Sequence, residues 1–142
     1  MDISGKTIMV LGGWGMVGQS ICRRLIPENP AKMVVCSLRN EDSLSMFDWV
    51  KNEVIGKDIE VDWDWGDIFV RKEFMATPRW ELLKNKDTRN LLIDDMTSEL
   101  DSESLESTAL YHLFDKHRPD CVIDCINTAT AIAYQNVYGR RK

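Results

Sequence analysis

The sequence lacks a surplus of basic residues, a long apolar run and an amino-terminal targeting signal. Its 142 residues include 18 Lys and Arg against 23 Asp and Glu, a formal net charge of −5, whereas domains that mainly bind nucleic acid are usually basic. The first apolar stretch, Thr7 to Leu11, is too short for a signal core. Nothing approaches the roughly 18 apolar residues of a membrane span. We therefore expect a protein that engages neither nucleic acid nor a membrane.

The four cysteines include no Cys-x-x-Cys pair, the spacing typical of zinc and redox sites. Each lies in an apolar segment, which predicts buried free thiols and a reducing compartment, the cytoplasm. His112 and His117 are five residues apart on an expected helix, so they do not share a face. We expect both histidines to be exposed and the chain to hold no metal. The cysteines are Cys22, Cys36, Cys121 and Cys125.

What the sequence does have is an alternation of strand-like and helix-like segments. This pattern predicts an α/β three-layer sandwich, a parallel Rossmann sheet with flanking helices and strand order 3-2-1-4. We expect one domain, residues 1–142, with a helical insertion at about 68–100 and Asn40 as the N-cap of the second helix. The expected strands are Lys6–Leu11, Met33–Cys36, Ile59–Trp65 and Cys121–Ile126. The expected helices are Met16–Leu25, Asn40 to about Gly56, Arg79–Leu92, about Ser102 to His117, and one within Thr128–Tyr138.

Three aspartates lie within expected strands. Asp62 and Asp64 share one strand face, which predicts a solvated edge face rather than a cation site or an acid–base pair. Asp124 interrupts an apolar strand, where a buried carboxylate would need a partner. The sequence offers no account of that residue.

The segment between the first strand and the first helix is rich in glycine. Gly12 is expected to permit the tight turn, Gly15 to let backbone amides approach a pyrophosphate, and Gly18 to let the helix pack close to the strand. The helix N-terminus would then present free N–H groups to the phosphates. The expected phosphate-binding segment comprises Gly12, Gly13, Trp14, Gly15, Met16, Val17 and Gly18.

This Gly-x-x-Gly-x-x-Gly segment resembles the extended and atypical short-chain dehydrogenases/reductases, which include nucleotide-sugar epimerases and dehydratases. Those enzymes usually carry Thr-Gly-Gly-x-Gly-Phe-Ile-Gly here, and this sequence differs at Leu11, Trp14 and Met16. The Val-Leu-Gly-Gly opening also resembles saccharopine-dehydrogenase-like reductases. The resemblance covers nearly the whole chain but only the first part of a complete family member. It implies an NAD(P)-binding domain that serves hydride transfer.

The end of the second strand favours NADP over NAD. NAD-specific domains place an acidic residue there to bind the ribose 2′-hydroxyl, but in this chain the segment from Cys36 to Asn40 has no acid, and the first one after it is Glu41. Arg39 is placed to meet a 2′-phosphate, and Ser37 adds a hydroxyl donor. Charge-assisted Arg–phosphate bonds are worth on the order of 1.5–3 kcal/mol. The alternative is that Arg39 is a solvated charge before a helix, which leaves NAD open.

Two further stretches match positions of the family. Asp67, followed by Ile68, comes after the third strand, where the resemblance implies an Asp that accepts from the adenine amino group; an ordinary turn residue is the alternative. Asn127, Thr128 and Ala129 follow the fourth strand, where the resemblance implies residues that line the adenosine ribose. These positions complete the expected cofactor site.

No catalytic residue can be assigned. Tyr138 and Lys142 match the family's Tyr-x-x-x-Lys motif but follow the fourth strand too closely to leave room for a fifth. One hypothesis is therefore a truncated NADP-dependent oxidoreductase or epimerase/dehydratase that is inactive alone. The other is a non-catalytic dinucleotide sensor. The small-molecule substrate is unknown, and a homo-oligomer is one option for the assembly.

Overall fold

The computed structural model describes residues 2–126. The chain divides into two compact units. The sheet unit comprises residues 2–66 and 114–126 of the described chain, and the helical unit comprises Asp67–Leu113. The prediction of one domain with an additional helical region stays a prediction; the observed helical region is longer than the expected 68–100.

The sheet unit is built on four parallel strands. They are β1 (Thr7–Leu11), β2 (Lys32–Ser37), β3 (Glu60–Trp65) and β4 (Cys121–Asp124), in the order β3-β2-β1-β4. All three pairings are parallel and in continuous register. The central strands β1 and β2 are apolar nearly throughout and almost fully buried, as expected for strands covered on both faces. The predicted α/β Rossmann-like fold and strand order are confirmed.

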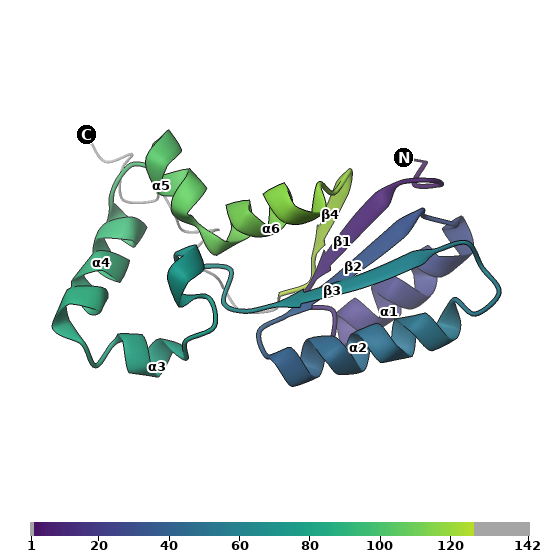
Figure 1. Cartoon of the computed structure of the whole chain (residues 1–142), viewed down its shortest axis with the longest axis horizontal. Helices are drawn as coiled ribbons and strands as arrows, with labels where there is room; N and C mark the ends of the chain where they lie inside the picture. Colours follow the sequence, from purple (N-terminus) through teal and green to yellow (C-terminus); the bar gives the residue numbers. More distant parts are fainter. Residues whose placement is uncertain (1, 127–142) are drawn as a thin grey trace. The chain divides into compact units, whose positions relative to one another are not determined.

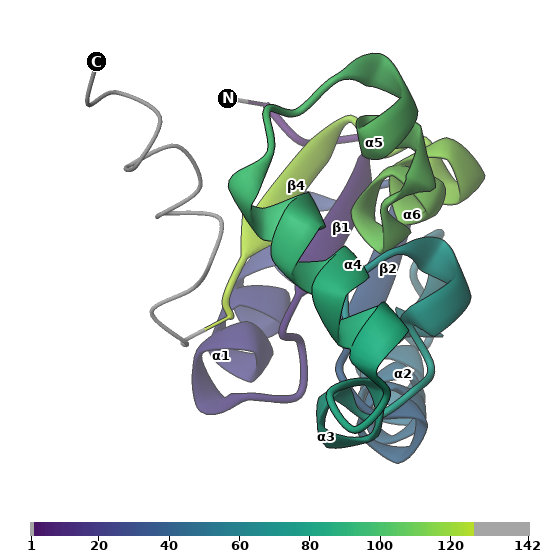
Figure 2. The ribbon, with the colours of Figure 1, turned by 90° about the vertical axis from the view of Figure 1, so that its left-hand side faces the viewer.

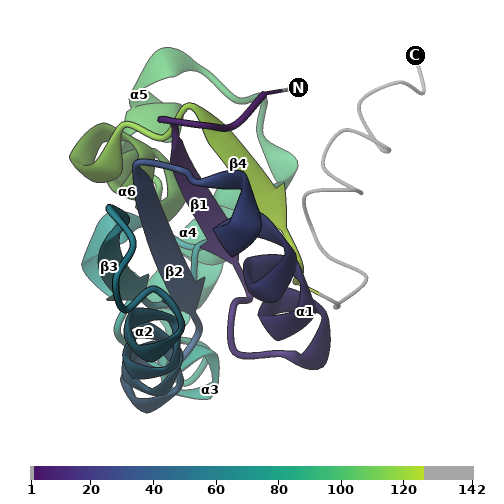
Figure 3. The same ribbon diagram turned by 90° about the vertical axis from the view of Figure 1, so that its right-hand side faces the viewer.

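Two helices cover one face of the sheet. These are α1 (Met16–Leu25) and α2 (Asn40–Glu53), which lie alongside the strands in Figures 1 and 3. A short 3-10 turn, Ile26–Glu28, follows α1. Ile8 and Met33 from the strands pack with Cys22 of α1 and with Met46 and Val50 of α2 in one hydrophobic cluster. This cluster is the main core of the unit.

The opposite face of the sheet is also covered. Met9 and Val34, which point to that face by strand alternation, are fully buried. The final turn of α6 (Ala109–His117) supplies Lys116 and His117, whose side chains bond to Asp64 of β3. The sheet unit is therefore layered as helices, sheet and helix, and the boundary between the two units falls inside α6.

The helical unit contains short helices around a small core. A 3-10 turn (Lys72–Phe74) precedes α3 (Arg79–Leu82), α4 (Lys86–Thr97) and α5 (Ser102–Ser107), which Figure 2 shows from the front. Val70, Leu82 and Leu92 form its hydrophobic cluster, with Phe74 and Met75 partly buried against it. None of the described helices is long and apolar enough to cross a membrane.

Several helix boundaries differ from those predicted. The expected helix Arg79–Leu92 is two helices, because Asn85 leaves helical geometry and its side chain caps α4 by accepting from the amides of Asp87 and Thr88. The expected helix from about Ser102 to His117 breaks at Thr108, which is extended, and the N-cap of its first part, α5, is Asp101. Asn40 is the first residue of α2, and Arg39 is the N-cap.

The burial of two segments also differs from prediction. The fourth strand is shorter than expected and alternates between half-buried and exposed residues, because it is the last strand of the described sheet. Asp124 is accordingly exposed and accepts a hydrogen bond from the Ile126 amide at 2.8 Å, which accounts for a carboxylate within an apolar segment. His117, expected to be exposed, has a side chain that is only 2% exposed.

Candidate cofactor site

The glycine turn lies at the carboxyl end of β1, where the chain passes to α1. Gly12 has φ +75°, a left-handed conformation that favours glycine, as predicted for the tight turn. A Cβ at Gly12 would also lie 3.0 Å from the Cys125 carbonyl carbon and oxygen. Because Cys125 directly follows β4, the turn lies between the carboxyl ends of β1 and β4. Open α/β sheets bind ligands at this kind of crevice.

Gly18 is required by packing of the helix against the turn. A Cβ there would lie 2.6 Å from the Gly13 carbonyl oxygen and closer still to the Gly12 carbonyl oxygen. The sequence predicts close packing at Gly18 against the strand; the structure shows close packing against the turn that follows the strand. Gly12 and Gly18 are therefore explained by the fold alone, without any ligand.

Gly15 is different because the protein itself leaves room for a side chain there. Its backbone is extended, with φ −64° and ψ 160°, which any residue adopts. Among the described residues, the only atom near a Cβ at Gly15 would be the Gly12 carbonyl oxygen, at an ordinary 3.5 Å. Within the described residues, nothing in the fold demands glycine at this position. A group that approaches the backbone from outside would demand it.

Some backbone amides near the turn donate hydrogen bonds within the fold, and others remain free to bind a ligand. Those of Gly12 and Gly13 donate to the Cys36 carbonyl, at 2.9 and 3.0 Å, and the Gly15 amide donates to Gly12. Gly15 is the N-cap of α1 and offers no side-chain bond to the helix. The first-turn amides, those of Met16, Val17 and Gly18, have no intrahelical carbonyl to bond. The free donors that could meet an anion are therefore at the helix start, not in the turn.

Large apolar side chains surround these amides and remain accessible. Trp14 is 41% exposed, Val17 56% and Met16 88%. Exposed apolar side chains of this size next to free amides are available to cover an aromatic or sugar ring. Figure 1 shows the turn at the start of α1, next to the ends of the strands.

Ser37, at the end of β2, holds the turn in place. Its hydroxyl oxygen accepts a hydrogen bond from the Trp14 amide at 3.2 Å, and its carbonyl accepts from the Gly66 amide. The side chain is nearly buried. A hydroxyl that accepts from the turn still has its own proton to donate, so a contact between Ser37 and a ligand stays a prediction.

Arg39 carries its charge at the start of α2 but is already paired. Its Nε and Nη2 donate to the two carboxylate oxygens of Asp42 at 2.9 and 3.1 Å. This pairing raises the pKa of the Arg39 guanidinium, with the Asp42 hydrogen bond as the main cause. Sequence analysis missed Asp42, although an acid three residues after an arginine on a helix start is a readable signal. It also missed Asn40, whose Oδ1 is buried with no donor in the described chain.

Asp67 and Ile68 belong to the helical unit. The Asp67 carboxylate accepts from Arg79 Nε and Nη2 at 3.0 and 2.6 Å and from the Phe69 amide at 3.0 Å. Ile68 is 7% exposed. A contact of Asp67 with an adenine amino group stays a prediction, in which the carboxylate would be shared with Arg79. Asn127, Thr128 and Ala129, like Tyr138 and Lys142, lie outside the described residues.

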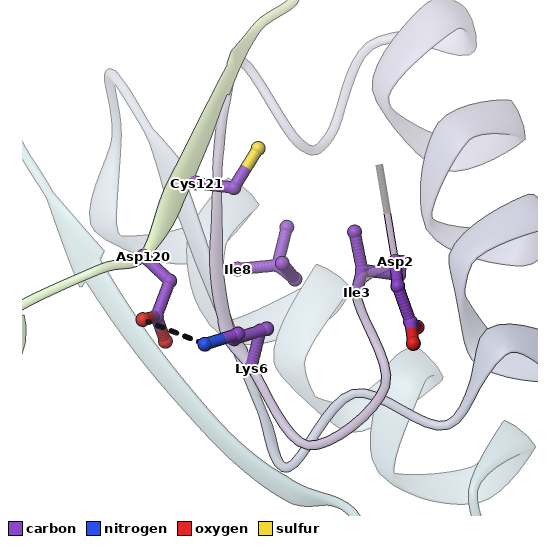
Figure 4. A pocket seen from close by; sticks show the side chains of 6 residues that line it. All are labelled: Asp2, Ile3, Lys6, Ile8, Asp120 and Cys121. Atoms are coloured by element: carbon purple, nitrogen blue, oxygen red, sulfur yellow. Dashed lines mark ion pairs between the residues drawn. The ribbon is translucent and has the colours of Figure 1, made fainter.

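A small cavity of about 180 Å³ lies elsewhere in the sheet unit. Figure 4 shows it lined by Ile3, Ile8, Cys121 and the Lys6–Asp120 ion pair, at the amino ends of β1 and β4. It is thus at the opposite end of these strands from the glycine turn. The cavity is also smaller than the roughly 300–1,000 Å³ typical of ligand pockets. We do not assign it to the cofactor.

A polar network around the buried side chain of His117 was also missed. His117 Nε2 lies 3.0 Å from Asp64 Oδ2 and Nδ1 lies 3.6 Å from Asp62 Oδ2, and Lys116 Nζ lies 2.8 Å from Asp64. Burial raises the pKa of Asp64, but the hydrogen bonds with His117 and Lys116 outweigh this effect and lower the pKa to about 2. The expectation of a solvated face is therefore wrong for Asp64, whose side chain is 13% exposed. No group of three or more His, Cys, Asp or Glu side chains in the described residues is arranged so that it could hold a metal ion.

Neither a protein family model nor a curated protein matches this sequence. Among the solved structures that are similar to this chain are the following three. The ligand-free 5-ketofructose reductase of Gluconobacter sp. strain CHM43 is 12% identical over 47% of this chain and 23% of its own, with a TM-score of 0.41. A short-chain type dehydrogenase/reductase from Mycobacterium ulcerans is 12% identical over 51% and 26%, with a TM-score of 0.42. Pen from Bacillus thuringiensis is 13% identical over 87% and 39%, with a TM-score of 0.46.

The present chain thus spans less than two fifths of the length of each of these proteins. The Rossmann-like description of the sheet unit rests on its own strand order, its parallel register and its glycine turn.

Proposed function

We propose that the sheet unit binds a nicotinamide dinucleotide at the glycine turn and serves as the cofactor-binding part of an oxidoreductase. The observation that carries this proposal is the open space at Gly15. The fold requires glycine at positions 12 and 18 for its own reasons, but the described residues leave room for a Cβ at position 15. A pyrophosphate seated against the backbone would not, because a side chain would separate its oxygens from the amides behind it.

The free amides fit this group. In the first turn of α1, those of Met16, Val17 and Gly18 combine with the helix dipole to favour an anion. The adenosine half would extend from the turn toward the end of β2, where Ser37 binds the turn and Arg39 follows. A guanidinium at this position suits a 2′-phosphate, so NADP is the favoured cofactor and NAD the alternative.

The chain's own contribution would be binding and orientation. When bound, the nicotinamide ring supplies hydride transfer to or from a carbon of the substrate. The exposed side chains of Trp14, Met16 and Val17 would cover the cofactor and exclude water around the turn. The described residues include no proton donor that we assign to catalysis. We expect the chain alone to bind NADPH without turning it over with a carbonyl substrate.

The test is calorimetric titration of the wild type and of Gly15→Ala with NADPH, alongside thermal unfolding. We expect Gly15→Ala to shift the unfolding temperature by only a few degrees, because its cost as an N-cap is within about 1 kcal/mol. NADPH affinity should fall at least tenfold, because the phosphate loses its approach to the amides.

Gly56→Ala is the matched control. Gly56 has φ +80°, and no atom of the described residues lies within 4 Å of a Cβ there, so alanine costs about 1 kcal/mol from the backbone alone. It follows α2, away from the glycine turn, and should leave NADPH affinity unchanged. The proposal is wrong if the folded wild type binds no dinucleotide, or if Gly15→Ala binds NADPH as tightly as the wild type.

A further inference from the structure

Arg39 faces a competitor for any phosphate that it might bind. It is the N-cap of α2, and its guanidinium folds back onto Asp42 in the first helical turn. Both contacts use the Nε–Nη2 edge, with distances of 2.9 and 3.1 Å to the two carboxylate oxygens. This is the forked geometry in which an arginine also grips a phosphate. The edge best suited to a 2′-phosphate is therefore occupied.

The two partners differ in how firmly they are held. The Asp42 side chain is 19% exposed and the Arg39 side chain is 70% exposed. The carboxylate is thus the more buried partner of the pair, and the guanidinium is the partner that solvent or a ligand can reach. A ligand reaching this corner of the molecule meets an arginine whose charge is already balanced.

We propose that Asp42 is a specificity-determining residue that competes with the 2′-phosphate of NADP for Arg39 and thereby weakens the preference for NADP over NAD. This inference rests on the proposed dinucleotide site. It concerns how strongly that site discriminates, which Asp42 sets through Arg39 without needing to touch the dinucleotide.

Both ways of admitting the phosphate carry a penalty. If the phosphate takes the Nε–Nη2 edge, the Arg39–Asp42 pair must break. If it takes the remaining Nη1 donors, two anions share one guanidinium and repel each other at short range. NAD has no 2′-phosphate and meets neither penalty. An exposed ion pair is weak and a phosphate dianion is a strong partner for arginine, so we expect NADP to win the competition at reduced affinity.

The experiment measures dissociation constants for NADPH and NADH by calorimetry in the wild type and in Asp42→Asn. Asparagine keeps the volume and removes the charge. We expect Asp42→Asn to tighten NADPH binding about three- to tenfold and to change NADH binding less than about twofold. The smaller ligands 2′,5′-ADP and 5′-AMP, which differ only in the 2′-phosphate, should show the same contrast.

Glu41→Gln is the matched control. Glu41 lies in the same helical turn as Asp42, and its substitution removes the same charge. The Glu41 side chain makes no ion pair with Arg39 in the described structure. It should change both affinities less than about twofold, as expected for a screened surface charge. In an Arg39→Ala background, Asp42→Asn should no longer favour NADPH beyond this control level.

The outcomes separate the two proposals. Weaker NADPH binding in Asp42→Asn would mean that Asp42 positions Arg39 for the phosphate, which overturns the inference. An effect equal to that of Glu41→Gln would overturn it as well, while NADPH binding by the wild type would still support the dinucleotide site. A folded wild type that binds neither dinucleotide would remove both proposals.

Discussion

The sheet unit and the helical unit differ in how much of their apolar material they bury. In the sheet unit, Ile8, Val10, Met33 and Val35 are fully buried, because the central strands are covered on both faces. In the helical unit, the described cluster of Val70, Leu82 and Leu92 is 5–7% exposed, and full burial is reached by Ala109 and Leu113 of α6. Many of this unit's large apolar side chains are exposed: Trp80, Leu83, Ile93, Met96, Leu100, Leu105 and Tyr111.

Because of this difference, the two units contribute unequally to the free energy of unfolding. Burial of apolar surface is the main favourable term in folding, so the sheet unit has the larger reserve. The glycine turn and Arg39 are attached to this better-packed unit, at the ends of its most buried strands. A rigid support of this kind suits a site whose geometry depends on backbone amides.

The largest expected effect comes from removing one core side chain in each unit. Ile8→Ala should cost about 3–5 kcal/mol, because Ile8 is fully buried and its site cannot collapse easily. Leu92→Ala should cost about 2 kcal/mol or less, because Leu92 lies in a small core that can rearrange. Hydrogen exchange resolved by residue is the measurement. Loss of protection in all four strands is expected for Ile8→Ala only.

Equal loss of protection across the whole chain in both variants would contradict the contrast between the units. It would mean that Leu92 and Ile8 stabilise one cooperative structure. A result confined to residues 67–113 for Leu92→Ala would instead show that the helical unit opens by itself.

A second, smaller effect concerns acid. The pKa of Asp64 is about 2 in the folded protein, against its ordinary value of 3.8. A carboxylate with a lowered pKa stabilises the fold above its ordinary value, and this stability is lost as the pH falls toward the folded value. We expect a loss of about 2 kcal/mol between pH 4 and 2. Asp64→Asn should remove most of that pH dependence. The measurement is the free energy of unfolding in urea at each pH, monitored by tryptophan fluorescence.

Asp62→Asn is the control on the same strand face. The pKa of Asp62 is also lowered. Burial raises it, but the hydrogen bonds that Asp62 accepts from Lys32 and from a backbone amide outweigh this effect. Its side chain is 39% exposed, so solvent should screen its contribution more strongly. If Asp62→Asn flattened the acid profile as much as Asp64→Asn, the buried His117–Asp64 contact would not be the source.

The smallest expected effect tests an ion pair of the helical unit. Arg71 Nε and Nη2 donate to the Asp95 carboxylate at 2.8 and 2.7 Å, and both side chains are more than a quarter exposed. We expect Asp95→Asn to cost about 0.5–1 kcal/mol, and less in 1 M salt. Asp94→Asn, which removes a charge without an ion pair in the described structure, should cost little. Hydrogen exchange of the α4 amides measures both variants.

The strands and the first two helices could be predicted because local pattern decides them. The buried strand before Gly12, the helix after it and the strand order follow from apolar runs, glycine spacing and α/β connection rules. Helices of the second unit were predicted with wrong boundaries, because caps by Asn85 and Asp101 depend on a single side chain each. Propensity alone does not distinguish such a cap from a helix interior.

The site was only partly readable. The pattern indicates which glycines matter, but only coordinates separate Gly15, where a Cβ would fit, from Gly18, where it would not. The burial of His117 depends on contacts with Asp62 and Asp64, more than fifty residues away in sequence. No local periodicity encodes a contact at that separation.

The glycine turn is completed by residues from the far end of the described chain. The Cys125 amide donates to the Leu11 carbonyl just before Gly12, and at the opposite end of the same two strands the Thr7 amide donates to the Asp120 carboxylate, 113 residues away. Long-range parallel pairing of this kind forms late in folding. During synthesis on the ribosome, the turn therefore waits for residues 120–125 to emerge. A shorter nascent chain contains the glycines but lacks the β4 segment that the turn packs against.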